Sequence, residues 1–328
     1  MKKSRFLVAG LTLVALFIGM FAGGVLAKSD YPSRPIEFVV PFNPGGGSDN
    51  MARMIAAIYD KERILPQPLV VVNKAGGSGS VGMSYVQTKN GDPYVIMTAV
   101  PQVLTVPLTT GSTDVLHWTK LTPIALLALD EFMLVVRYDS PYQNVKELVN
   151  AAKAAPKTIK FGGSEVGSED SILTDIFAQK AGVQFNYIPF KSGGEVMTAL
   201  LGGHLDVVWA NPNEAMSQME AKKVRVLAVA NRERLKGAPN IPTLKENGID
   251  VHWQMLRGIF AAPGIKDAER KVLEKAMKKL TDSPTWKKDF IEANFLTPKY
   301  MDSKAYAQFL KDKEAEYKAI LKNLGVLK

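Results

Sequence analysis

The chain has 328 residues, with 46% hydrophobic and 22% charged residues, a formal net charge of +9 and no cysteine. This length exceeds what one hydrophobic core usually organises, so two domains are expected. Without cysteine, disulfides, thiolate metal sites, cysteine nucleophiles and lipid-modified cysteines are excluded. The basic excess is modest and not clustered, so nucleic acid is not an expected partner.

The first 27 residues have the character of a targeting segment. Three basic residues precede an uncharged run over residues 6–27, which closes on Val25-Leu26-Ala27 before Lys28. Small residues at minus three and minus one suit signal peptidase, so we expect cleavage after Ala27 and export of the remaining chain. The apolar run is also long enough to span a bilayer, which leaves an uncleaved anchor as the alternative.

Strand-like and helix-like patterns alternate over residues 36–98. The strands are IEFVV, PLVVVN and YVIMTA, and helices are predicted over residues 49–61 and 80–88. Alternation of this kind, with continuous apolar strands, is typical of a parallel sheet covered by helices on both faces.

Two of these strands run directly into glycine-rich loops that precede a helix. Residues 38–53 read FVVPFNPGGGSDNMAR, and residues 73–79 read NKAGGSG. Glycines let the backbone approach a ligand closely, and the first amides of a helix carry partial positive charge, so an anion is the expected ligand. Both loops fall at the carboxyl edge of the sheet, where open α/β sheets bind ligands. The alternative is that PGGG is only a tight turn and that Ser48 or Asp49 is only a helix cap.

A second series of strands and helices follows two strand-like segments within residues 122–137. Helices over residues 145–155, 169–180, 194–201 and 213–221 alternate with the strands TIKFGG, FNYIPF, DVVWAN and VRVLAVAN. The loops that end these strands are further candidate binding loops, and this carboxyl edge should face that of the first sheet.

The chain is expected to cross between two domains twice. The polar, proline-rich residues 231–242 are interpreted as the return crossing, after which RGIFAAPG and helices near 267–281, 284–293 and 302–322 complete the first domain. The predicted fold is a two-domain α/β fold with a ligand cleft between domains and a hinge of two crossings. Its predicted parts are a signal peptide (1–27), a discontinuous domain I (28–123 plus 233–328) and a domain II (124–232).

Other chemistry finds little support. Residues 77–82 fit GxGxxG, but no acidic residue follows the next strand as a dinucleotide site requires. The three histidines lack metal-ligand spacing and no GxSxG is present, so neither a cofactor, a metal nor an enzyme is expected. An acidic trio, Glu165, Glu169 and Asp170, could hold a metal or form the first turn of a helix. Trp253 and Arg257 could be a cleft wall and an anion clamp, or serve packing and surface charge.

Five ordered motifs carry a resemblance that covers the mature chain: YPSRPIEFVVPFNPGGGSD, VVVNKAGGSGSVG, FGGSEVGSEDSILTDIF, YIPFKSGGEVMTALLGGHLDVVWAN and IPTLKENGIDVHWQMLRGIFAAPG. They resemble the Bug family, the extracytoplasmic solute receptors of tripartite tricarboxylate transporters. The resemblance implies a periplasmic-binding-protein fold of two α/β domains around a cleft. It also implies a small organic carboxylate as ligand and a membrane permease of one large and one small subunit as partner.

The resemblance also implies site residues. The family's first ligand loop falls on Phe42, Pro44, Gly45, Gly46 and Asp49. Its second loop falls on Asn73, Gly76, Gly77, Ser78 and Gly79, and the loop of the second domain on Ser164, Gly167 and Ser168. The second loop departs from the usual NRPGAGG at Lys74, Ala75 and Ser78, and a position that is commonly histidine is Ser171 here.

Further candidates come from the residues themselves. The hydroxyl of Ser48 could add a hydrogen bond, and Asn211 and Trp253 could line the cleft. The resemblance adds Lys191, because the family's YKG-like motif is Phe190-Lys191-Ser192 here; it implies that Lys191 could contact the ligand or brace its loop. The expected function is that of a periplasmic, monomeric, non-enzymatic receptor for a mono-, di- or tricarboxylate that feeds a secondary transporter. The alternatives are a periplasmic sensor subunit and a periplasmic enzyme that acts on a carboxylate or ester.

Overall fold

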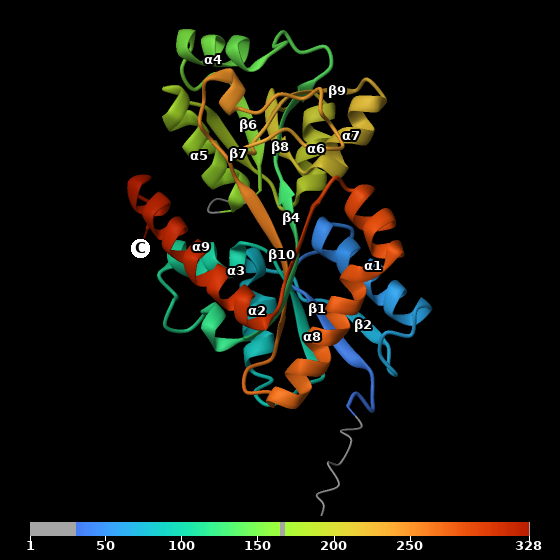
Figure 1. The fold of residues 1–328 in the computed structure, drawn as a ribbon. Coiled ribbons are helices and arrows are strands. Elements are labelled where there is room, and N and C mark those ends of the chain that lie inside the picture. Colours follow the sequence, from blue (N-terminus) through green and yellow to red (C-terminus); the bar gives the residue numbers. More distant parts are fainter. Residues whose placement is uncertain (1–30, 165–167, 328) are drawn as a thin grey trace, which may run out of the picture. The chain divides into compact units, whose positions relative to one another are not determined.

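Two β-sheets organise the fold of the computed structural model, which describes residues 31–164 and 168–327. Both sheets lie within one unit, Pro32–Lys328 (Figure 1). We call the six-stranded sheet with its helices lobe 1 and the five-stranded sheet with its helices lobe 2. The mixed α/β fold with two sheets confirms the predicted fold class. The predictions about the leader fall outside the described residues.

The sheet of lobe 1 has the order β11-β4-β10-β3-β1-β2. Its strands are β1 (Ile36–Val40), β2 (Leu69–Asn73), β3 (Val95–Ala99), β4 (Thr122–Glu131), β10 (Gln254–Ala261) and β11 (Thr297–Met301). The first three strands pair in parallel, as the alternating pattern predicts. The sheet as a whole is mixed, because β4 carries the chain out to lobe 2 and β10 brings it back antiparallel to both β4 and β3.

Five α-helices of lobe 1 cover this sheet: α1 (Gly47–Lys61), α2 (Ser80–Gln87), α3 (Gln102–Thr110), α8 (Asp267–Asp282) and α9 (Ser303–Asn323). Helix α1 illustrates why they pack, since its buried residues Met51, Ile55 and Ile58 recur at helical spacing and form one apolar face. Short helical turns lie at Gly77–Gly79, Trp118–Lys120 and Lys245–Asn247, and Trp286–Glu292 is a π-helix.

The sheet of lobe 2 has the order β7-β6-β8-β5-β9. Its strands are β5 (Met133–Arg137), β6 (Lys160–Gly163), β7 (Asn186–Pro189), β8 (Val207–Ala210) and β9 (Val224–Val229). Its helices are α4 (Val145–Ala154), α5 (Glu169–Ala181), α6 (Gly193–Leu201) and α7 (Pro212–Glu220), each beginning within one residue of its predicted start. Strands β6, β7 and β8 run in parallel, so the loops that follow them gather at one edge.

The two crossings between the lobes lie side by side. Strand β4 ends at Glu131 and β5 begins at Met133, so the first crossing is a single residue, Phe132. Ala230 N donates to Phe132 O at 2.8 Å, and Trp253 N donates to Ala230 O at 2.9 Å. Such a narrow pair of hydrogen-bonded crossings is suited to act as a hinge.

Residues 231–242, interpreted from the sequence as the return crossing, pack against lobe 2. Val229 N donates to Pro242 O at 2.9 Å, and the core of lobe 2 includes three apolar residues of this segment, Leu235, Ala238 and Ile241. The chain therefore crosses back to lobe 1 at a point in the sequence that is nearer to β10 than its composition indicates. The exact domain bounds remain a prediction.

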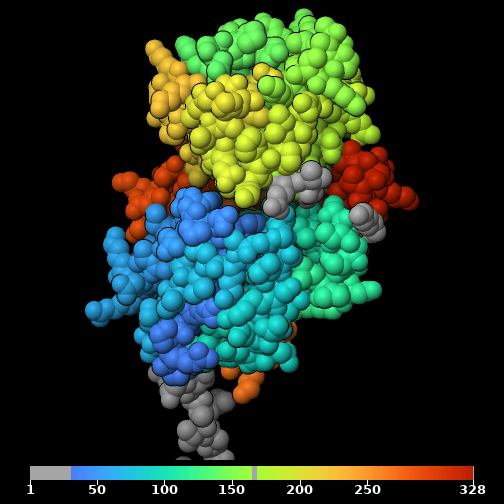
Figure 2. All heavy atoms as spheres, turned by 180° about the vertical axis from the view of Figure 1, so that it is seen from behind, coloured from blue at the N-terminus to red at the C-terminus, as the bar shows by residue number. Residues whose placement is uncertain are grey.

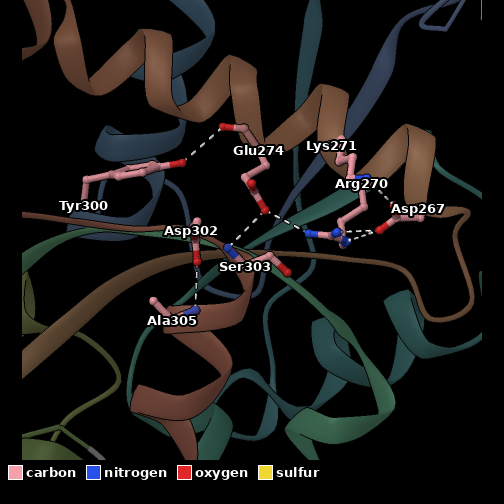
Figure 3. Close-up of polar contacts among 8 residues, drawn as sticks. All are labelled: Asp267, Arg270, Lys271, Glu274, Tyr300, Asp302, Ser303 and Ala305. Atoms are coloured by element: carbon pink, nitrogen blue, oxygen red, sulfur yellow. Dashed lines mark hydrogen bonds and ion pairs between the residues drawn. The ribbon is translucent and has the colours of Figure 1, made fainter.

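A polar network joins the C-terminal elements of lobe 1 (Figure 3). Glu274 Oε2, on α8, accepts from Arg270 Nη1 at 2.9 Å and from Ser303 N, at the start of α9, at 3.2 Å. Asp302 caps α9, and Tyr300 OH donates to the carbonyl oxygen of Glu274 at 3.5 Å. Helix α9, red in Figures 1 and 2, is thereby tied at its N-terminal end to α8. Within the described residues, no helix combines the length and apolarity that a bilayer span needs.

Candidate ligand-binding cleft

A cavity of about 1250 Å³ lies between the lobes. It is somewhat larger than the roughly 300 to 1,000 Å³ typical of small-molecule sites, so it has room for a small ligand together with water. Most residues predicted for the site line it: Phe42, Pro44, Gly45, Gly46, Ser48, Gly76, Gly77, Ser78, Gly79, Ser164, Ser168, Lys191 and Asn211. Three others, Asp49, Asn73 and Trp253, are not among its lining residues, and Gly167 lies outside the described residues.

Asp49 and Asn73 brace the first glycine loop from behind. Asp49 Oδ2 accepts from Gly45 N and from Arg53 Nε, both at 2.9 Å, while Asn73 Nδ2 donates to Asp49 Oδ1 at 2.9 Å and to Phe42 O at 3.1 Å. Burial acts to raise the pKa of Asp49, but these hydrogen bonds outweigh it and hold the pKa below its ordinary value. The two side chains therefore shape the loop and leave its cavity face to backbone groups.

The second glycine loop needs its glycines for conformational reasons. Gly76, Gly77 and Gly79 have positive φ, between 53° and 134°, which residues with a side chain rarely adopt; Ser78, between them, also has a positive φ of 51°. A Cβ built on Gly79 would lie 3.3 Å from the ring of Phe42, so the two loops also pack closely on each other. The backbone of this loop can line the cavity only because the sequence supplies these glycines.

Arg257 places a buried cation at the start of α1. Its side chain, on β10, is 6% exposed. Arg257 Nε donates to Asp130 Oδ2 at 3.1 Å, and Nη2 donates to the same oxygen. A Cβ built on Gly47 would lie 2.9 Å from Nη2 and 3.3 Å from Nη1, so the guanidinium lies against the first turn of the helix. Among the described residues, Nη1 has no acceptor, and Arg257 lines the cavity. This geometry favours the anion-clamp interpretation over that of surface charge.

The wall contributed by lobe 2 is acidic. At the start of α5, Asp170 accepts from Ser164 N, from Ser168 Oγ and, at 3.1 Å, from Ser171 N. At α7, Glu214 Oε2 accepts from Asn211 N at 3.4 Å, in a capping box. The protein's own carboxylates thus occupy helix starts that would otherwise attract an anion.

Glu214 also approaches the first residue of α6. A Cβ built on Gly193 would lie 2.9 Å from its Oε1. Burial raises the pKa of Glu214 to about 6, and the negative charge of Asp130 adds to the rise. The hydrogen bond from the Asn211 N–H acts in the opposite direction and lowers the pKa. A carboxyl group is therefore packed close to the amides of a second helix start in lobe 2.

Gln102 and Glu169 join the two walls. Gln102 is the first residue of α3, and Glu169 is the first residue of α5. The side-chain Nε2 of Gln102 donates a hydrogen bond to Oε2 of Glu169, with a distance of 2.6 Å between the two atoms. Gln102 was not predicted as a site residue, and Glu169 was considered only as part of an acidic trio that could hold a metal or form the first turn of a helix; it does begin helix α5. Gln102 follows the third strand of the first sheet directly, and the rule that ligands bind at the carboxyl edge could have drawn attention to it.

Trp253 supports the fold beside the cleft. The residue is 3% exposed, and its ring stacks on that of Tyr317 of α9, with ring centroids 4.9 Å apart and an interplanar angle of 13°. Burial among apolar neighbours thus holds α9 against the second crossing. Within residues 31–164 and 168–327, no group of three or more His, Asp or Glu side chains is arranged to hold a metal ion.

Two α/β lobes joined by paired crossings, with backbone amides and one buried cation around a cavity between them, define a solute-binding protein of the two-lobed class. The family profile described as "Tripartite tricarboxylate transporter family receptor" matches residues 51–326. The chain belongs to this family. It is a solute-binding receptor of a tripartite transporter, and because the family's receptors are periplasmic binding proteins, it acts outside the cytoplasmic membrane.

Individual proteins agree with the family match. A Cupriavidus necator protein described as "UPF0065 protein in gbd 5'region" is 32% identical over 333 residues, which cover 100% of this chain and 99% of the relative. A TctC solute binding protein from Polaromonas is 31% identical, with a TM-score of 0.69 over 89% of this chain and 99% of that one. R. palustris Rpa4515, solved with adipate, shares the fold at 24% identity, with a TM-score of 0.83 over 90% of this chain and 99% of that one.

Proposed function

We propose that this receptor captures a small organic carboxylate between its lobes and delivers it to a permease with one large and one small integral membrane subunit. We further propose that the chain is exported after cleavage behind Ala27 and works as a monomer that returns its ligand chemically unchanged. The ligand's carboxylate would lie against the first turn of α1 and the second glycine loop. Hydroxyl groups that line the cavity, among them those of Ser48 and Ser168, would add directional hydrogen bonds.

The observation that carries this proposal is the guanidinium of Arg257 packed against Gly47. Helix-start amides and a buried cation converge there on one point of the cavity wall. Charge-assisted hydrogen bonds contribute about 1.5 to 3 kcal/mol each, so a few of them suffice for micromolar binding, which corresponds to about −8 kcal/mol. The adipate held by the R. palustris neighbour is an example of a ligand of this chemical class.

A thermal-shift screen tests the proposal. The purified chain without its leader is melted with adipate, malate, citrate and benzoate, each matched by its neutral amide. A ligand at a hundred times its dissociation constant adds about 2.7 kcal/mol to the free energy of unfolding, so at least one acid should raise the melting temperature while its amide does not. Equal shifts by acids and amides, or shifts by neutral sugars alone, would overturn the carboxylate assignment.

The enzyme alternative is tested separately. The acid that binds best, and its methyl ester, are incubated with the receptor and analysed by mass spectrometry. A receptor returns both unchanged after many protein equivalents have been offered. Steady turnover of either compound would contradict the non-enzymatic role.

A further inference from the structure

We propose that Gln102 and Glu169 form a proton-dependent clasp that holds the two lobes together, with Glu169 protonated in the closed form. The clasp is a positioning device, because it acts on the distance between the walls. It concerns closure itself, so it does not depend on which solute the cleft binds.

The two residues are placed to join the lobes at the cavity. Each is the first residue of a helix, α3 in lobe 1 and α5 in lobe 2, and each lines the cavity. The hydrogen bond from Gln102 Nε2 to Glu169 Oε2 measures 2.6 Å and links positions 67 residues apart. Opening the lobes must break this bond.

Two unpaired oxygens indicate where the proton resides. The other side-chain oxygen of each residue, Gln102 Oε1 and Glu169 Oε1, is buried and has no hydrogen-bond partner among the described residues. While Glu169 is ionised both atoms are acceptors, so neither can satisfy the other. A protonated Glu169 has an O–H to donate, and a neutral acid and a primary amide can then pair through two reciprocal hydrogen bonds. A single proton thus satisfies both orphan atoms, which are otherwise costly to bury.

The charges around Glu169 favour this protonation. The charged or titratable groups that act on it are Asp170 on its own helix, Asp130 on β4, Arg257 on β10 and Tyr317 on α9. The one cation among these four already pairs with Asp130. Burial raises the pKa of Glu169 to about 8, and the negative charges of Asp170 and Asp130 add to the rise, whereas its backbone hydrogen bond and Arg257 lower it.

The direction of the pH effect follows from linkage. In an opened cleft Glu169 meets water, where a glutamate titrates near its ordinary pKa of about 4.3, so closure takes up a proton over the range between that value and about 8. The ratio of closed to open molecules therefore falls as the pH rises, by up to about tenfold per pH unit. Above pH 8 the closed form would have to bury an ionised Glu169.

The absence of cysteine makes the test direct. Cysteines are introduced in the full mature chain at Ser84 on α2 and Ser217 on α7, both exposed, and their spin labels report the distance between the lobes without any ligand. Between pH 6 and pH 9 the closed population of the parent chain should fall at least tenfold relative to the open one. A distance distribution that does not change over this range would overturn the proposal.

Variants separate the clasp from a general effect of pH. Glu169→Gln keeps a donor and an acceptor at every pH, so its closed population should change less than twofold, whereas Gln102→Leu should be open at both pH values. Asp175→Asn is the matched control, because it removes a carboxyl with a raised pKa from the same helix and should follow the parent chain. If Glu169→Gln shows the parent's pH response, the clasp is wrong, provided that circular dichroism shows both proteins folded.

Discussion

The two walls of the cleft offer a ligand opposite chemistry. The lobe-1 wall combines glycine backbone with Arg257, and its nearby acid, Asp49, bonds to the loop from behind. The lobe-2 wall carries carboxyl groups at the starts of its helices, with Asp170 and Glu214 bonded to backbone amides there. We infer that lobe 1 holds the ligand's carboxylate. Because lobe 2 has its own acids at its helix starts, we infer that it selects the remainder of the ligand.

The largest expected effect comes from filling the lobe-1 wall. Gly46 has φ −80°, and a Cβ there would meet only Asn43 O, at 3.8 Å, so Gly46→Val should fold normally. Its side chain would occupy the position of the ligand's oxygens and remove two or more charge-assisted hydrogen bonds, weakening binding by about 100-fold or more. Calorimetric titration with the acid found by thermal shift measures this.

The matched control lies on the opposite wall. Gly194 also lines the cavity, with open space around a Cβ, so Gly194→Val should weaken binding much less than Gly46→Val if lobe 1 holds the carboxylate. Equal losses in the two variants would contradict the division of labour between the walls.

Arg257 gives the next largest effect. Arg257→Met alone should destabilise the fold by about 3 to 5 kcal/mol, because it leaves Asp130 buried without its partner. The double variant Arg257→Met/Asp130→Leu should regain most of that stability yet bind the acid about 10- to 100-fold more weakly. Chemical denaturation and titration measure the two quantities separately. Full affinity in the stable double variant would remove Arg257 from the site.

Asp49 should act on stability in a pH-dependent way. Its folded pKa is lowered, so its contribution is present above the ordinary pKa of an aspartate, about 3.9, and is lost as the pH falls through the folded pKa. Asp49→Asn should therefore be less stable than the parent chain at pH 6, by about 1 kcal/mol, with the difference shrinking below pH 4. Urea denaturation from pH 2.5 to 7 would show this. A difference that grew on acidification would have the wrong sign.

The smallest effect on ligand binding is expected at Trp253. Because its ring packs on Tyr317 and does not line the cavity, Trp253→Phe should lower stability by about 1 kcal/mol and change affinity less than twofold. A large loss of affinity with an unchanged melting temperature would return this residue to the binding surface.

The sequence predicts those parts of the fold in which local pattern and tertiary role agree. The strand, glycine loop and helix over residues 36–61 are of this kind, since apolar strand residues, turn glycines and helical periodicity all point the same way. Helix α3 is not predicted, because QVLTVPLTT is rich in β-branched residues and contains Pro107. Strand β11 is short, lies at a sheet edge and contains Pro298, and so gives a weak strand signal.

The binding site likewise has a part that the sequence predicts and a part that it does not. The glycine loops could be placed at the cleft because chain order alone puts them at one sheet edge. Which side of a loop faces the ligand could not be predicted, since the brace formed by Asp49 and Asn73 joins residues 24 apart through side-chain geometry. The pair Arg257–Asp130 depends on the pairing of β10 with β4, which sequence periodicity does not define.

The central claim is that the lobe-1 wall binds a carboxylate by its charge. The most direct measurement is calorimetric titration of the parent chain with the tightest-binding acid of the thermal-shift panel and with that acid's neutral amide, under identical buffer and salt. The account predicts at least about 100-fold tighter binding of the acid, because the amide forms no charge-assisted bonds with Arg257 and the helix start. Equal affinities for the acid and the amide would contradict it.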